Sequence, residues 1–183
     1  MYGTGQGIPM DHAEAVRWYR LAADQGHAEA QRYLGIMYRF GVGLGAAGRA
    51  SAIDRGEAVR WFRLAADQGD ASAQHNLGVM HDYGQGVPED DAEASRWWRL
   101  AADQGHANAQ YNLGFMYSNG SGVPQDYVQM HMWFNLAASR SAGEDRERAV
   151  RGRDLAADEL TPDALNEAQR LAREWDAAHP REP

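Results

Sequence analysis

Small and apolar residues recur at helical spacing in three similar segments, residues 28–40, 71–83 and 107–119. All three have alanine at the first and third positions, glutamine at the fourth, and a Leu-Gly-x-Met run from the seventh. The positions that differ between the segments recur three and four residues apart, which places them on one face of a 3.6-residue helix. Each segment is therefore predicted to be a helix, called helix A, with a constant face and a variable face.

A second segment, called helix B, follows each helix A and also precedes the first one. Its Arg-Trp motif with Leu-Ala-Ala-Asp-Gln-Gly occupies residues 17–26, returns at 60–69 and 96–105, and degenerates at 133–138. The period of roughly 40 residues is that of a two-helix repeat. Four tryptophans share one position of helix B, so all are predicted to lie in the core: Trp18, Trp61, Trp97 and Trp133.

Glycines and caps predict where these helices end. Gly26, Gly69 and Gly105 each close a helix B as left-handed cap residues. The glycine-rich segments 41–44, 84–87 and 120–123 follow helix A and are interpreted as tight turns. Near the C-terminus, Thr161 as N-cap and Pro162 at the first helical position predict the start of a further helix.

The combined pattern, Ala-x-Ala-Gln-x-x-Leu-Gly-x-Met-Tyr-x-x-Gly-x-Gly-Val followed by Ala-x-x-Trp-x-x-x-Ala-Ala-x-x-Gly, resembles the Sel-one-like repeat, a relative of the tetratricopeptide repeat. The resemblance covers the chain up to about Ala138. It implies an all-α fold, a right-handed superhelix of antiparallel helix pairs. Residues 1–140 would form the repeat array, with about three full units and partial units at the ends. Residues 141–183 would add C-terminal capping helices and a tail to the same domain.

The first residues align with the end of a helix A. Met1 to Ile8 correspond to Met116 to Val123, so the sequence opens inside a repeat. The helix expected from Asp11 to Gln25 would then lack its own partner helix, and Met1 would be an internal methionine. An open edge of a repeat array exposes apolar surface, so homodimerisation through this edge is a further prediction.

Stacked repeats would align the variable faces of the A helices into one surface, which is the concave one in tetratricopeptide-type arrays. Tyrosine and arginine commonly anchor partners at interfaces, and asparagine side chains hold peptide backbones. We therefore predict a partner-binding surface, called the variable face, made of Glu29, Arg32, Tyr33, Ile36, Arg39 and Phe40, then Ser72, His75, Asn76, Val79, Asp82 and Tyr83, then Asn108, Tyr111, Asn112, Phe115, Ser118 and Asn119.

Composition narrows the function further. The chain has no cysteine, which excludes thiol catalysis, thiolate metal sites and disulfides, and all 18 basic residues are arginine. P-loop, Ser-x-x-Lys and pyridoxal chemistry each need a lysine and are excluded too. A net charge of −8 argues against nucleic-acid binding. The seven histidines show no metal-ligand spacing, and no cofactor is expected.

Three functions remain open. The first is a non-catalytic adaptor that binds a protein or peptide, in line with the roles of the resembled family in quality control, signalling, export and host interaction. The second is a self-assembling structural module. The third is a hydrolase, because some proteins of that family are described as hydrolases or β-lactamases, but Ser72, His75 and Asp82 on one helix do not form a relay. The sequence shows no signal peptide and no membrane-spanning run, which leaves a cytoplasmic or periplasmic location open.

Overall fold

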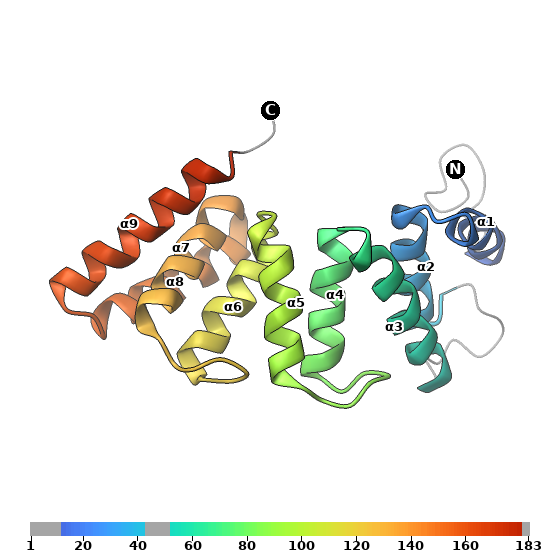
Figure 1. Ribbon diagram of the computed structural model, residues 1–183, viewed down its shortest axis with the longest axis horizontal. Helices are drawn as coiled ribbons and strands as arrows, with labels where there is room; N and C mark the ends of the chain where they lie inside the picture. The colour runs from blue at the N-terminus through green and yellow to red at the C-terminus, as the bar shows by residue number, and fades with distance from the viewer. Residues whose placement is uncertain (1–11, 43–51, 181–183) are drawn as a thin grey trace. The chain divides into compact units, whose positions relative to one another are not determined.

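The computed structural model describes residues 12–42 and 52–180 (Figure 1). Within these residues all regular secondary structure is α-helical, so the predicted all-α repeat fold is confirmed. The helices are α1 (His12–Asp24), α2 (Ala28–Phe40), α3 (Ala52–Asp67), α4 (Ala71–Asp82), α5 (Asp91–Asp103), α6 (Ala107–Asn119), α7 (Tyr127–Arg140), α8 (Gly143–Asp158) and α9 (Pro162–Ala178).

Two of the sequence-based predictions fall outside this description. The segment Met1 to Ile8, on which the prediction of an incomplete first repeat rests, lies outside the described residues, as do residues 43–44 of the glycine turn after α2. The right-handed sense of the superhelix stays a prediction. Among the described residues, no helix combines the length and the hydropathy that crossing a bilayer requires.

The chain divides into two compact units, residues 1–89 and 90–183. In the first unit, α2 packs against α1 and α3, and α3 packs against α4. Leu34 and Leu77, which share a constant position of helix A, and Phe62 of α3 are fully buried and form the core. Gly35 explains the Leu-Gly pair of the motif: a Cβ at this position would lie 2.7 Å from Cδ1 of Phe62. The glycine therefore lets the phenylalanine ring of α3 rest on the backbone of α2.

The Ala-Gln pair of each helix A ties it to the helix B before it. The side-chain amide of Gln31 donates to the carbonyl of Ala23 at 3.1 Å, and Gln74 donates to Ala66 at 3.2 Å. In the second unit, Gln110 donates to Ala102 at 3.2 Å. These carbonyls belong to the last turn of helix B, where each also accepts from the backbone N–H of the cap glycine, Gly26, Gly69 or Gly105. The buried glutamine is a second donor to each of them, and it links helix A to helix B.

The glycines predicted to end the helices have the left-handed backbone conformation expected of them. The backbone angle φ is 90° at Gly26, 91° at Gly69 and 83° at Gly105. Gly41 and Gly120, which follow A helices, have φ of 68° and 73° and act as left-handed C-caps. Since this region of backbone space is costly for other residues, the glycines set the helix boundaries.

The second unit ends in α7, which holds the degenerate helix B motif, and in α8 and α9, which do not follow the repeat pattern. α7 packs against α6, α8 and α9, and the ring of Phe134 lies against Gly114 of α6 and Gly152 of α8. Thr161 caps α9 through a hydrogen bond from the backbone N–H of Ala164, which confirms the predicted helix start. The outer side of α9 carries exposed ion pairs of Arg170 with two glutamates, so polar groups cover this helix.

The prediction that all four repeated tryptophans lie in the core is wrong for one of them. Trp61, Trp97 and Trp133 are at most 5% exposed, whereas Trp18 is 53% exposed. The difference in exposure follows from the helices that pack against each tryptophan's own helix. The helix of Trp61, α3, packs against helices on both sides along the chain, α2 and α4, whereas α1 packs against α2.

Candidate functional site

In the first unit, the variable face runs along α2 and α4 and ends in two exposed aromatic rings. Phe40 is 59% exposed and Tyr83 is 67% exposed, and both occupy the same repeat position, one at the end of α2 and one directly after α4. Glu29 is also exposed, while the remaining members on these helices are half-buried: Arg32, Tyr33, Ile36, Arg39, Ser72, His75, Asn76, Val79 and Asp82.

Both arginines of the variable face are tied to the next repeat. The guanidinium of Arg32 donates to a carboxylate oxygen of Asp70, the N-cap of α4, at 3.1 Å. Arg39 donates to the side-chain oxygens of Asn76 at 2.9 Å and of Gln85 at 3.3 Å. These two members of the predicted partner-binding surface therefore take part in the packing of the repeats. They hold α2 and α4 together.

The electrostatics of the two arginines differ. Burial opposes the charge of Arg32, but its hydrogen bond with Tyr33 and its pairing with Asp70 outweigh burial and raise its pKa. Burial and the nearby Arg55 lower the pKa of Arg39, whose described hydrogen-bond acceptors are neutral amides. Arg39 thus places a weakly compensated positive charge 5.2 Å from the ring of Phe40.

A stack of three side chains crosses from α1 to α2. Tyr19 of α1 stacks on Tyr33 at a centroid distance of 5.1 Å and an interplanar angle of 28°. The guanidinium carbon of Arg32 lies 4.3 Å from the centroid of the Tyr33 ring. Burial raises the pKa of Tyr19, and the neighbouring Tyr33 and Glu29 raise it further. Tyr33 is therefore held in place and takes part in the packing of α1 on α2.

In the second unit, the variable face lies on α6. Some of its residues pack against other helices, and others are exposed to solvent. Tyr111 packs edge-on against Phe134 at 5.2 Å, and the guanidinium of Arg148 lies 5.6 Å from its ring. By contrast, Phe115 is 53% exposed. Asn108 and Asn119 are also exposed, and Asn112 and Ser118 are half-buried. Tyr111 thus belongs to the contact of α6 with α7 and α8.

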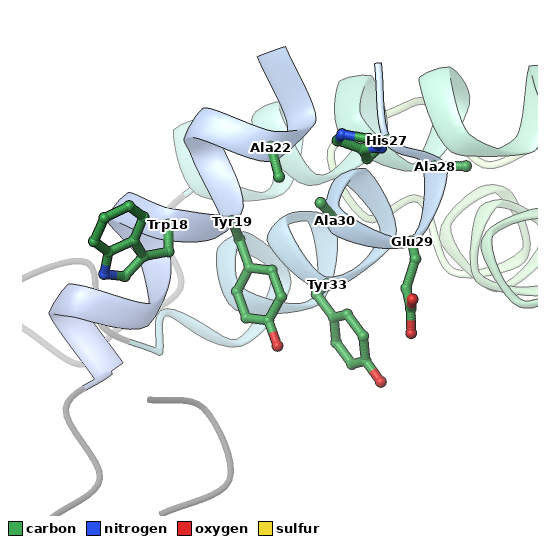
Figure 2. Close-up of a pocket in the computed structure, with 8 residues that line it drawn as sticks. All are labelled: Trp18, Tyr19, Ala22, His27, Ala28, Glu29, Ala30 and Tyr33. Atoms are coloured by element: carbon green, nitrogen blue, oxygen red, sulfur yellow. The ribbon is translucent and has the colours of Figure 1, made fainter. Parts of the chain in front are cut away.

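A hollow of about 690 Å³ lies between α1 and α2 (Figure 2). Tyr19 and Tyr33 point toward the same side, with the carboxylate of Glu29 beside them. The repeat pattern does not predict this hollow, and its one sign in the sequence is Tyr19, which has a hydroxyl where the equivalent residues Phe62 and Phe134 have none. The lining residues are Trp18, Tyr19, Ala22, His27, Ala28, Glu29, Ala30 and Tyr33.

Nothing in the described structure assembles a catalytic or metal centre. Within residues 12–42 and 52–180, no three His, Asp or Glu side chains are grouped as a metal ion would require. α4 carries Ser72, His75 and Asp82 at the helical spacing that argued against a relay. The arrangement presents aromatic rings framed by arginines, which suits the burial of a partner's apolar surface.

Comparisons with known proteins agree with the repeat pattern. The model for the Sel1 repeat matches residues 1–27, 28–70, 71–106 and 107–141. The crystal structure of a protective antigen of uropathogenic Escherichia coli strains, which displays an SLR fold, is 34% identical with a TM-score of 0.84. It matches 97% of this chain, which spans 36% of that protein's length. A Sel1 repeat protein from Oxalobacter formigenes is 27% identical with a TM-score of 0.69, over 98% of this chain and 83% of its own. A comparison with curated proteins found no match.

Proposed function

Because the chain belongs to the Sel1 repeat family, we propose that it is a scaffold that binds a peptide or a protein surface along the variable face of its A helices. Proteins with Sel1 repeats are generally helical-repeat scaffolds for protein interactions, and their fold is typically non-catalytic. The proposal for this chain adds the surface, which we expect to be the concave one, and the residues that anchor the partner.

The exposed pair Phe40 and Tyr83 carries the proposal. Both side chains leave more than half of their surface in water, at the same position of consecutive repeats. A partner that covered them would gain about 2 kcal/mol for each ring. Phe115 of α6 adds a third exposed ring in the second unit. Aromatic residues of this kind form the hot spots of protein interfaces.

The remaining members of the variable face frame these rings. Arg32 and Arg39 are fixed by their contacts with α4, so they lose little side-chain entropy when a partner binds. Asn76 is less available than the sequence suggested. It accepts a hydrogen bond from Arg39 and donates one to the carbonyl of Ser72 at 2.8 Å. We therefore expect the aromatic rings to contribute most of the binding energy and the fixed arginines to determine the specificity.

Substitution of the two rings tests the proposal. The double variant Phe40→Ala, Tyr83→Ala and the control Leu155→Ala each shorten exposed apolar side chains, Leu155 being 63% exposed on α8. Partners captured from the source cell by the wild-type protein are identified and then titrated with each purified variant. We expect the double variant to weaken binding at least about tenfold and the control to leave it unchanged. Equal affinity for the wild type and the double variant contradicts the proposal.

Self-association through α1 is a second candidate, favoured by the exposure of Trp18 and Leu21, at 53% and 54%. A homodimer built on these residues would bury them on both copies. Light scattering over a range of concentrations measures the mass, and Leu21→Glu is the informative variant. A wild-type mass that rises toward twice the monomer, and a monomeric variant, support this candidate. A monomer at every concentration rules it out. No observation in the described structure favours the hydrolase alternative.

A further inference from the structure

The two arginines of the variable face on α2 differ in how their charges are neutralised. Arg32 lies 3.1 Å from a carboxylate oxygen of Asp70 and 3.6 Å from one of Glu29. Arg39, about two turns further along α2, is held by two neutral side-chain amides. Within residues 12–42 and 52–180, Arg39 forms no ion pair. Its guanidinium is therefore fixed in place without a counter-ion.

A second arginine lies close to Arg39. Arg55, in the first turn of α3, is exposed, and after burial its charge is the next cause of the lowered pKa of Arg39. The turn after α4 joins the two sites. A Cβ on Gly86 would lie 2.6 Å from the carbonyl carbon of Arg55, and the side chain of the preceding Gln85 accepts a hydrogen bond from Arg39. We call Arg39, Arg55, Asn76 and Gln85 the basic corner.

No acidic residue occurs in the sequence that connects α2 to α3. Residues 41–51 contain one arginine and neither aspartate nor glutamate, so this connection has no side-chain carboxylate to offer the basic corner. A half-buried charge without a counter-ion costs free energy that amide hydrogen bonds offset only in part. The basic corner therefore has an unmet need for a carboxylate.

Comparison of the repeats indicates that the fold does not require an arginine at this position. The residue equivalent to Arg39 is Asp82 in α4 and Ser118 in α6. An arginine that only tied one helix to the next could be expected to recur with the packing it serves. The planar guanidinium is also the group that best receives a carboxylate, through two parallel hydrogen bonds. These observations favour a ligand from outside the chain.

We propose that the basic corner binds a carboxylate of the partner, so that the peptide covering Phe40 carries an aspartate or a glutamate next to its apolar anchor. This inference rests on the proposed function and adds the chemistry of the partner. The guanidinium carbon of Arg39 lies 5.2 Å from the centroid of the Phe40 ring. Neighbouring residues of a peptide have Cα atoms about 3.8 Å apart, so one residue can cover the ring while the next reaches the arginine.

The charges along the variable face also fix where the acidic residue lies. At the second exposed ring, Tyr83, the preceding residue is Asp82 in place of Arg39, and a carboxylate there would meet a like charge. Arg32 already has two carboxylates within 4 Å. The acidic residue of the partner is therefore assigned to the Phe40 end of the surface.

A phage-displayed library of random peptides is the probe. It is selected on the intact wild-type protein, on Arg39→Gln and on Arg60→Gln. The glutamine at position 39 removes the charge but keeps an amide donor. Arg60→Gln is the matched control, because it makes the same change of net charge at an exposed ion pair with Glu57 on α3.

We expect the wild type and Arg60→Gln to enrich peptides in which an acidic residue adjoins an aromatic or aliphatic one, and Arg39→Gln to lose the preference for acid. One enriched peptide is then synthesised with its acidic residue and with the corresponding amide. Fluorescence anisotropy should show about fivefold weaker binding of the amide peptide to the wild type, and nearly equal binding of both peptides to Arg39→Gln. The comparison on the wild type needs no variant.

Equal acidic content of the peptides selected by the wild type and by Arg39→Gln overturns the inference, as does equal affinity of the wild type for the acidic and the amide peptide. If such peptides still lose binding to the double variant Phe40→Ala, Tyr83→Ala, the proposed function stands without the inference. A selection that yields no peptide dependent on these two rings contradicts both.

Discussion

Replacement of Gly35 by alanine tests how closely the repeats are packed. An alanine in a helix interior is ordinarily favoured over glycine by about 1 kcal/mol. At Gly35, however, the new Cβ would lie 2.7 Å from Cδ1 and 2.8 Å from Cε1 of Phe62. The phenylalanine ring is fully buried and cannot swing into solvent, so α2 and α3 must separate. Overpacking of this kind typically costs about 1–3 kcal/mol.

Gly56 of α3 provides the matched control, since a Cβ at this position has no neighbour within 4 Å. Gly56→Ala should raise the free energy of unfolding by about 0.5–1 kcal/mol. Gly35→Ala should lower it by up to about 2 kcal/mol, because the overpacking cost is partly offset by the higher helix propensity of alanine. Urea denaturation followed by circular dichroism measures both. Phe62→Leu, combined with Gly35→Ala, should cost less than the sum of the single changes because it relieves the overlap. Stabilisation by Gly35→Ala equal to that by Gly56→Ala would refute this account.

Three other changes test separate parts of the structure. Asp70→Ala removes the cap of α4 and the partner of Arg32. It should lower the free energy of unfolding, measured by urea denaturation, by about 2 kcal/mol. The control Asp90→Ala removes only a cap hydrogen bond from the N–H of Glu93 and should lower it by about 1 kcal/mol. Equal losses would mean that the Arg32 contact adds no stability. Burial, and then Arg153, lower the pKa of His131 below 6.5 in the folded state. The unfolded chain therefore binds the proton more readily, and stability falls as the pH drops through about 6.5; the melting temperature of His131→Met should fall less than that of the wild type between about pH 7.5 and 5.5. Trp175→Ala removes the ring that α9 places against Trp133 and Arg140; we expect a loss of about 3 kcal/mol and faster amide exchange in α9, and unchanged exchange would show that α9 does not depend on this ring.

Comparison of the repeats predicted the local structure well. The bounds of α2 and α6 match the predicted segments, and α4 ends at Asp82, one residue before the predicted end. The reason is that helix ends here depend on short-range chemistry: glycines with positive φ and the threonine cap of α9. Such signals are readable without knowledge of the tertiary fold.

What the comparison missed depends on contacts between repeats. Arg32 and Arg39 vary along the chain, yet they bind α4, because a residue at an edge of the helix can vary together with its partner in the next repeat. The exposure of Trp18 could not be predicted from its motif, which differs from that of Trp61 only in having Tyr19 in place of Phe62. The cluster of Arg140, Trp175 and His179, in which the last two rings stack at 4.1 Å, has no earlier copy for comparison.

The central claim is that this member of the Sel1 repeat family holds its partner on the exposed rings of the variable face. A photo-cross-linking amino acid introduced at Phe40, at Tyr83 or at Leu155 tests it directly in the source cell. The account predicts that positions 40 and 83 label the same partner and that position 155, although equally exposed to solvent, does not. Labelling of that partner from position 155 alone, or of unrelated proteins from positions 40 and 83, would contradict it.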